Sequence, residues 1–237
     1  MIVTIVHTAL PAVGAQLAEN LALLRGRRGR KVLLLDASPE RLCERWGLDR
    51  ARSHLRPAVA SRTVSGSDLP GELERQLARF DDIVIDTAGG GPECRCALIA
   101  ARVALVPLAA EHADIDARYD LIAQLNGARM FNPGLRVLFV TAGGENDPAP
   151  QASAAMRAYA AQVMSAGVAG TTLHLPALQW GADVPGRCVC DIDSSTGAAE
   201  MTALYGEVYR ASSAAAPTGL SASPSSVHAV GGRILQK

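Results

Sequence analysis

Short, almost entirely apolar segments recur along this chain of 237 residues, and they constrain its fold more than any other feature. A strand that is apolar on both sides must be covered on both faces, as in parallel sheets. Helical patterns lie between these segments, so the sequence predicts an α/β fold, a doubly wound and mostly parallel sheet with helices on both faces. The expected strands are residues 2–6, 32–35, 83–85, 103–106, 137–140 and, more weakly, 171–175. The expected helices begin near Gly14 and cover residues 69–80, 115–125, 152–165 and 198–209.

Composition sets the expected boundaries of the domain. Residues 1–211 carry the strand and helix patterns, whereas residues 212–237 are rich in Ala, Ser, Pro and Gly and predict a flexible tail. No apolar run approaches the roughly 18 residues that a membrane span needs. Met1 leads directly into an apolar segment rather than a signal peptide, and five cysteines do not suggest a disulfide framework. We therefore expect a cytoplasmic protein without a membrane span.

Positive charge is concentrated in one stretch of a chain whose net charge is zero. Residues 25–62 contain eleven Lys or Arg and four acids, a net charge of +7. This asymmetry permits an anionic partner such as DNA, and Arg45, Arg52 and Arg56 are the candidate nucleic-acid contacts. For the basic residues within 25–31 we favour a structural role at the end of the first helix, where cations complement the helix dipole.

Candidate site residues gather where the strands end. In a doubly wound sheet, ligands bind at the carboxyl ends of the strands. The segment 8–16 follows the first strand, Asp36 follows the second, and Asp86 with the glycines of 89–91 follows the third. The sequence therefore predicts one functional edge that contains all of them.

Several motifs along this frame resemble one family. They are Arg28-Gly29-Arg30-Lys31 followed by the strand and Asp36-Ala37-Ser38-Pro39, then Phe80-Asp81-Asp82-Ile83-Val84-Ile85-Asp86-Thr87-Ala88-Gly89, and then Ala101 to Leu108. Over about residues 1–210 the chain is similar to the ParA/MinD family of deviant Walker-type P-loop ATPases, which position plasmids, chromosomes and division sites. The resemblance implies a P-loop NTPase-like fold, catalysis by Asp36 and Mg²⁺ coordination by Asp86. It also implies a homodimer or a heterodimer with an active ParA-like paralogue, with DNA or a DNA-bound adaptor as a further partner.

The resemblance fails at the phosphate-binding loop. The family loop reads Lys-Gly-Gly-X-Gly-Lys-Thr, and aligning its last glycine with Gly14 places Ala15 at the P-loop lysine and Gln16 at the Mg²⁺-binding hydroxyl. Leu10 then stands at the signature lysine, and Pro11 and Ala12 stand at glycines. A charged hydrogen bond contributes roughly 1.5–3 kcal/mol, so these losses could cost on the order of 5 kcal/mol. We expect a degenerate P-loop with no cofactor, or with weakly bound ATP and Mg²⁺.

Three functions remain open from the sequence. The first is a non-catalytic or weakly catalytic partner in plasmid partition, DNA segregation or subcellular positioning. The second is a ParA-type ATPase that binds Mg-ATP through a non-standard loop, and the third is a DNA-binding module that uses residues 25–62. Asp86 could equally be a helix cap or a hydrogen-bond acceptor in the switch loop. Leu10, Pro11 and Val13 are expected to pack into the former phosphate pocket as a plug.

Two Cys-X-Cys pairs are the remaining candidate metal ligands. Cys94 with Cys96 and Cys188 with Cys190 could together offer four thiolates to Zn²⁺ or to an iron–sulfur cluster. The spacing is weak, and free cysteines are commonly small core residues. We favour the core interpretation.

Overall fold

The computed structural model describes residues 1–109, 115–144, 146, 150–178 and 184–210. The expected tail, 212–237, lies outside the described residues. The strands are β1 (Ile2–His7), β2 (Val32–Asp36), β3 (Ala60–Thr63), β4 (Asp82–Ala88), β5 (Val103–Ala109), β6 (Arg136–Gly143) and β7 (Ala166–His174). The helices are α1 (Pro11–Arg27), α2 (Leu42–Arg52), α3 (Leu69–Leu77), α4 (Gly91–Ala100), α5 (Ile115–Phe131), α6 (Pro150–Ala160), α7 (Leu175–Leu178) and α8 (Thr196–Arg210), with 3₁₀ turns η1 (Gly66–Asp68) and η2 (Val189–Asp191).

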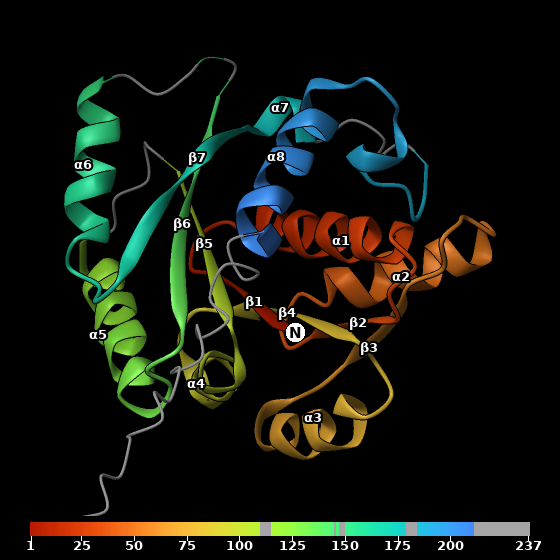
Figure 1. Ribbon diagram of the computed structural model, residues 1–237, viewed down its shortest axis with the longest axis horizontal. Helices are drawn as coiled ribbons and strands as arrows, with labels where there is room; N and C mark the ends of the chain where they lie inside the picture. Colours follow the sequence, from red (N-terminus) through yellow and green to blue (C-terminus); the bar gives the residue numbers. More distant parts are fainter. Residues whose placement is uncertain (110–114, 145, 147–149, 179–183, 211–237) are drawn as a thin grey trace, which may run out of the picture.

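The seven strands form one sheet in the order β3-β2-β4-β1-β5-β6-β7, and every strand pair is parallel (Figure 1). The first strand therefore lies in the middle, between β4 and β5. This arrangement confirms the predicted doubly wound α/β fold. The register places Asp36 of β2 opposite Asp86 of β4, so the two predicted site residues are neighbours across the sheet.

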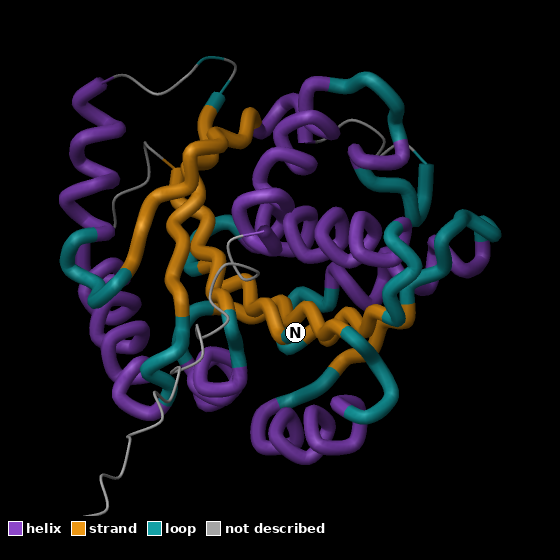
Figure 2. Tube along the Cα trace, in the orientation of Figure 1, coloured by secondary structure: helices purple, strands orange, loops and turns teal. Residues whose placement is uncertain are grey.

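Helices cover both faces of the sheet (Figure 2). On one face, α1, α2 and α8 bury a core that includes Leu17, Leu21 and Leu204. On the other face, α4, α5 and α6 pack around Phe139, and α3 packs on Leu33 and Ile85. Because the strands are buried on both sides, their continuous apolar sequence follows from their position.

The elements that the sequence did not predict lack a regular apolar pattern. β3 has no apolar run, because it is a short edge strand with alternating exposure. α2 is rich in arginine, and α4 begins in a glycine-rich segment, so neither shows an apolar stripe. β7 begins at Ala166, five residues before the expected strand, and α6 ends at Ala160, five residues before the end expected for that helix.

A buried arginine ties α2 to the segment before α8. The guanidinium of Arg50, which is 1% exposed, donates to Asp191 Oδ2 at 2.7 Å and to the carbonyl oxygens of Gly186, Pro57 and Arg56. Gly186 has a φ of +78°, and a Cβ there would lie only 2.1 Å from the backbone nitrogen of Arg50. Arg50 lies within the basic stretch that the sequence marks as a possible anion-binding surface, but it is a structural residue.

Candidate functional site at the carboxyl edge

The segment that should form a phosphate cradle is helical here. α1 begins at Pro11, three residues before the expected start at Gly14, and the Gly14 N–H already donates to the Leu10 carbonyl at 3.0 Å. Proline at the first helical position favours this start, because its fixed φ suits a helix and its missing N–H would have no intrahelical acceptor. The expectation of a loop up to Gly14 is therefore wrong.

The apolar residues of this turn pack against the core. Val13 is 7% exposed, and Leu10 is partly buried against the cluster that contains Leu17. Pro11 is half-buried and Ala12 is exposed. Leu10 and Val13 thus pack against the core, and the plug in the former phosphate pocket stays a prediction.

Gly14 makes room for a histidine. A Cβ on Gly14 would lie 2.4 Å from Cδ2 of His7 and 3.2 Å from Oδ1 of Asp86. His7 ends β1 and is 2% exposed. Its imidazole thus lies between the first turn of α1 and Asp86. Of the other two predicted cofactor-binding residues, Ala15 is 2% exposed and Gln16 is half-buried.

Asp36 holds the beginning of α2. Its carboxylate accepts the backbone N–H of Ser38 at 3.1 Å and that of Glu44 at 3.0 Å. Burial raises the pKa of Asp36, backbone hydrogen bonds oppose this effect, and Asp86 adds to it. Asp36, the predicted catalytic residue, therefore anchors the amino end of a helix.

Asp86, the predicted Mg²⁺ ligand, is fully buried at the end of β4. Neither of its carboxylate oxygens has a hydrogen-bond partner of ordinary geometry among the described residues; Nε2 of His7 lies 3.5 Å from Oδ1, and the Cys43 thiol is a further neighbour. His7 Nε2 likewise lacks a hydrogen-bond partner within the described part of the chain. Unpaired buried polar groups of this kind cluster at functional sites.

A third carboxyl group joins the two that the sequence predicted. Glu19 lies two turns into α1 and is 7% exposed. Burial raises the pKa of Glu19 well above its ordinary value, and the charges of Asp86 and Asp36 raise it further. The only sequence signal for this residue is an acid in a helical segment that is otherwise uncharged from Pro11 to Leu24.

The three arginines predicted to contact nucleic acid are all exposed. Arg45 and Arg52 lie seven residues apart, and so on the same side of α2. Arg45 donates to the Glu40 carbonyl, and Arg52 pairs with Asp49 at 3.4 Å. Arg56 follows the helix in the connection to β3. The structure leaves these three side chains accessible, while Arg62 pairs with Glu72.

The cysteine pairs lie apart in the fold. Cys94 of α4 packs in the core around Phe139, whereas Cys188 and Cys190 pack in the core on the α1 side of the sheet. Burial raises the pKa of the Cys94 thiol to about 12, and it does the same for Cys190. Within the described ranges no group of three or more His, Cys, Asp or Glu has metal-binding geometry.

Several solved structures match this fold over most of their length and of this chain. A plasmid partition protein from Borrelia burgdorferi matches with a TM-score of 0.61 at 13% identity, over 89% of this chain and 98% of that one. MinD from Aquifex aeolicus matches with 0.60 at 12% identity, over 88% and 97%. Cobyrinic acid a,c-diamide synthase from Mycobacterium smegmatis matches with 0.57 at 16% identity, over 89% and 94%.

The fold is that of the ParA/MinD type of P-loop ATPase. No family model and no curated protein matches the sequence. Among the described residues, no helix combines the length and hydropathy of a membrane span.

Proposed function

We propose that this protein is a ParA-like partition or positioning protein with a degenerate nucleotide site, and that it acts as a non-catalytic or weakly catalytic partner. The observation that carries the proposal is the beginning of α1. Where a P-loop needs glycines and lysines, the chain has a helical turn from Pro11 and a buried alanine at position 15. Without the glycines the backbone N–H groups cannot curl around a phosphate.

Charge at the edge supports the same proposal. ATP would bring further negative charge to a region where Glu19, Asp36 and Asp86 lie together, and neither Ala15 nor Leu10 supplies a cation. Bound Mg²⁺ would not offset this repulsion between ATP and the carboxylates. Asp86 could take the ion, but Asp36 is engaged by backbone N–H groups, and Gln16 has no hydroxyl. These residues therefore do not fit Mg-ATP.

For assembly we propose a homodimer, or a heterodimer with an active ParA-like paralogue, through the carboxyl edge. The proposal is supported by similarity in fold to MinD from Aquifex aeolicus, which was solved in a complex with MinC. Sedimentation of the protein alone tests the homodimer: a purely monomeric protein at high concentration leaves only the heterodimer.

Calorimetry with Mg-ATP tests the nucleotide proposal. We expect no saturable heat below about 1 mM nucleotide, and no more hydrolysis than a variant that lacks residues 8–13. Asp86→Asn is the matched control, because it removes the carboxylate that could hold Mg²⁺. Binding or turnover in the parent that is lost in Asp86→Asn would contradict the proposal and establish an ATPase with a non-standard loop.

A DNA-binding role is the second candidate, and the exposure of Arg45, Arg52 and Arg56 favours it. Binding should be weak and should fall steeply with salt, because phosphate contacts release counterions. Charge reversal of these three arginines should abolish it. The matched control is reversal of Arg79, Arg95 and Arg157, arginines outside the 25–62 stretch. If the control weakens binding equally, the surface lies elsewhere.

A further inference from the structure

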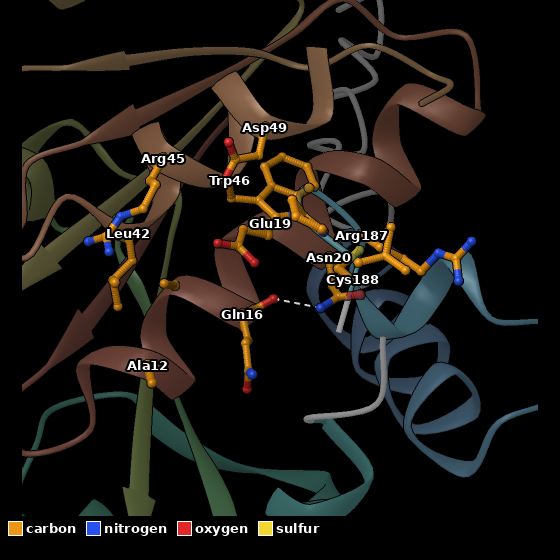
Figure 3. A pocket seen from close by; sticks show the side chains of 14 residues that line it. Ala12, Gln16, Glu19, Asn20, Leu42, Arg45, Trp46, Asp49, Arg187 and Cys188 are labelled. Atoms are coloured by element: carbon orange, nitrogen blue, oxygen red, sulfur yellow. Dashed lines mark hydrogen bonds between the residues drawn. The ribbon is translucent and has the colours of Figure 1, made fainter. Parts of the chain in front are cut away.

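A pocket of about 270 Å³ lies between α1 and α2, beside the candidate nucleotide edge (Figure 3). Gln16 and Glu19 line it from α1, Leu42, Arg45 and Trp46 line it from α2, and Pro185 closes it from the segment before η2. The pocket thus faces along the flank of α1, whereas a P-loop would hold phosphates at the end of that helix.

Glu19 is the central polar group of this pocket. Figure 3 shows its carboxyl pointing into the space between the two helices, with Trp46 above it and Gln16 below. The residue is 93% buried, none of the hydrogen bonds of the described residues involves its carboxyl group, and its oxygens keep access to the pocket rather than being sealed in the core. Burying such a group without a partner is costly. A ligand that supplies the partner would remove that cost.

The charges around Glu19 define the sign of the missing partner. Asp86 of β4 and Asp36 of β2 both act on it unfavourably, and His7 of β1 faces Asp86. The same negative charges act on the neighbouring thiol of Cys43 on α2. Burial raises its pKa most, and Asp86, Glu19 and Asp36 raise it further.

The nearby arginines do not contact Glu19, although the buried Nε of Arg187 in the pocket lining has no acceptor among the described residues. The Arg45 guanidinium is exposed and donates to the Glu40 carbonyl, and Arg52 pairs with Asp49 at the rim. In Figure 3 the Arg187 side chain extends away from Glu19. The field at the carboxyl of Glu19 is therefore negative.

Trp46 supplies an aromatic wall to the lining, and only its ring bears on a cationic ligand, because its N–H needs an acceptor that a cation does not offer. Its indole N–H is buried and has no acceptor among the described residues. One side of the ring is occupied by Arg50, whose guanidinium carbon lies 5.3 Å from the ring centroid. An aromatic wall next to a carboxylate is a common setting for organic cations.

We propose that this pocket binds the ammonium or guanidinium group of an organic cation, with Glu19 as its anion and Trp46 as its wall. The group comes from a free small molecule or from a Lys or Arg side chain of a partner. The inference goes beyond the proposed function, because it requires neither nucleotide nor DNA.

The test uses fluorescence and calorimetry with n-butylguanidinium as the probe. The chain has two tryptophans, so Trp180→Phe leaves Trp46 as the only reporter. We expect a saturable response at pH 8 that Glu19→Gln weakens about tenfold to a hundredfold, the range for a lost charge-assisted hydrogen bond. The matched control Glu74→Gln changes an exposed acid on α3 and should leave affinity unchanged. Equal binding by the parent and Glu19→Gln overturns the proposal.

Proton linkage provides a second readout. Because the pKa of Glu19 is raised, binding of a cation should release a proton, and affinity should increase from pH 5.5 to pH 8. Calorimetry in buffers with different ionisation enthalpies measures that proton. An affinity that does not change with pH overturns the role of Glu19. Glu19→Gln should melt at or above the parental temperature, so loss of binding would not reflect unfolding.

The source of the cation is resolved with a capped arginine peptide. Tighter binding of the peptide than of n-butylguanidinium assigns the site to a partner's side chain. Equal or tighter binding of n-butylguanidinium assigns it to a free small molecule. Sodium pentanoate, which carries the same butyl chain on a negatively charged group, should give no response in either case.

Discussion

At the last turn of α1, Arg25 donates to Oδ2 of Asp82 at 2.6 Å, and Arg30 donates to the same oxygen at 3.0 Å. Burial acts to raise the pKa of Asp82, but the hydrogen bonds from Arg30 and Arg25 outweigh it, and the pKa is lowered. Asp86, which lies beside the first turn of α1, and Glu19, which lies halfway along the helix, are also buried but have no such cation, and the pKa of Glu19 is raised.

The difference separates the part of α1 that stabilises the fold from the part that is available for a ligand. A buried charge with partners costs little, whereas a buried charge without partners lowers stability and is retained where a function uses it. The paired end, near Asp82, lies at the amino edge of the sheet. The unpaired end, where the first turn of α1 meets Asp86, lies at the carboxyl edge, where sheets of this type bind ligands, and Glu19 follows halfway along the helix.

The largest expected effect comes from installing a P-loop at the unpaired end. In the variant with glycines at Pro11 and Ala12, lysine at Ala15 and threonine at Gln16, two glycines enter a helix and a lysine enters a position that is 2% exposed. We expect a loss of about 3–6 kcal/mol, several degrees in melting temperature, without a gain in ATP affinity. A variant that melts at the parental temperature and binds ATP would show that the pocket is merely vacant.

Removing the charge at the paired end should be nearly as damaging. Asp82→Asn leaves Arg25 and Arg30 without their anion, and we expect a loss of about 2–4 kcal/mol in urea unfolding. Asp81→Asn is the matched control, because its side chain is 43% exposed and lies 3.9 Å from Arg30. It should cost less than about 1 kcal/mol. Equal losses in both variants would remove the contrast between the two ends of α1.

Gly14→Ala tests the packing of His7 at the unpaired end. The new Cβ would lie 2.4 Å from the imidazole, so we expect a loss of about 1–3 kcal/mol in spite of the better helix propensity of alanine. In Gly127→Ala on α5, where a Cβ meets nothing within 4 Å, only the propensity gain should appear. Adding His7→Ala to Gly14→Ala should recover part of the loss. No recovery would show that His7 does not fill the space above Gly14.

A change in pH should affect the two ends in different ranges. The pKa values of Glu19 and Asp36 are higher in the folded protein than in the unfolded chain. Their contribution to stability is therefore complete at a pH below the unfolded pKa, and it is lost as the pH rises through the folded pKa. Stability should therefore decline from about pH 5 to pH 8. The lowered pKa of Asp82 acts in the opposite direction and at lower pH.

Glu19→Gln should flatten the decline between pH 5 and pH 8. At pH 8 the variant should be more stable than the parent by on the order of 1 kcal/mol. Thermal unfolding across this range measures both slopes. Parallel curves for parent and variant would mean that Glu19 is not the titrating group.

The smallest expected effect comes from the exposed arginines. Charge reversal of Arg45, Arg52 and Arg56 should change the free energy of unfolding by no more than about 0.5 kcal/mol, because surface ion pairs contribute little. A large loss would mean that these side chains belong to the paired, structural set together with Arg50.

The sequence predicted the fold well because continuous apolar strands occur almost only in covered parallel sheets. It also placed Asp36 and Asp86 together, since both follow parallel strands. It did not place the start of α1 at Pro11, although proline favours the first position of a helix, because the resemblance to a P-loop predicted a loop up to Gly14. Glu19 was missed because its importance depends on two carboxylates from other strands, and Arg50 looked like a surface cation because its partner Asp191 lies far along the chain.

That distance has a consequence for the order in which the chain can fold. Arg50 and Asp191 are separated by 141 positions. During synthesis, α2 emerges long before the residues that neutralise and enclose its arginine. A nascent chain that ends before Gly186 holds this guanidinium with only the nearby carbonyls of Arg56 and Pro57. We therefore expect closure of the α1–α2 side of the molecule to be a late, long-range step in which the amino-terminal half takes its final form only with the last third of the chain.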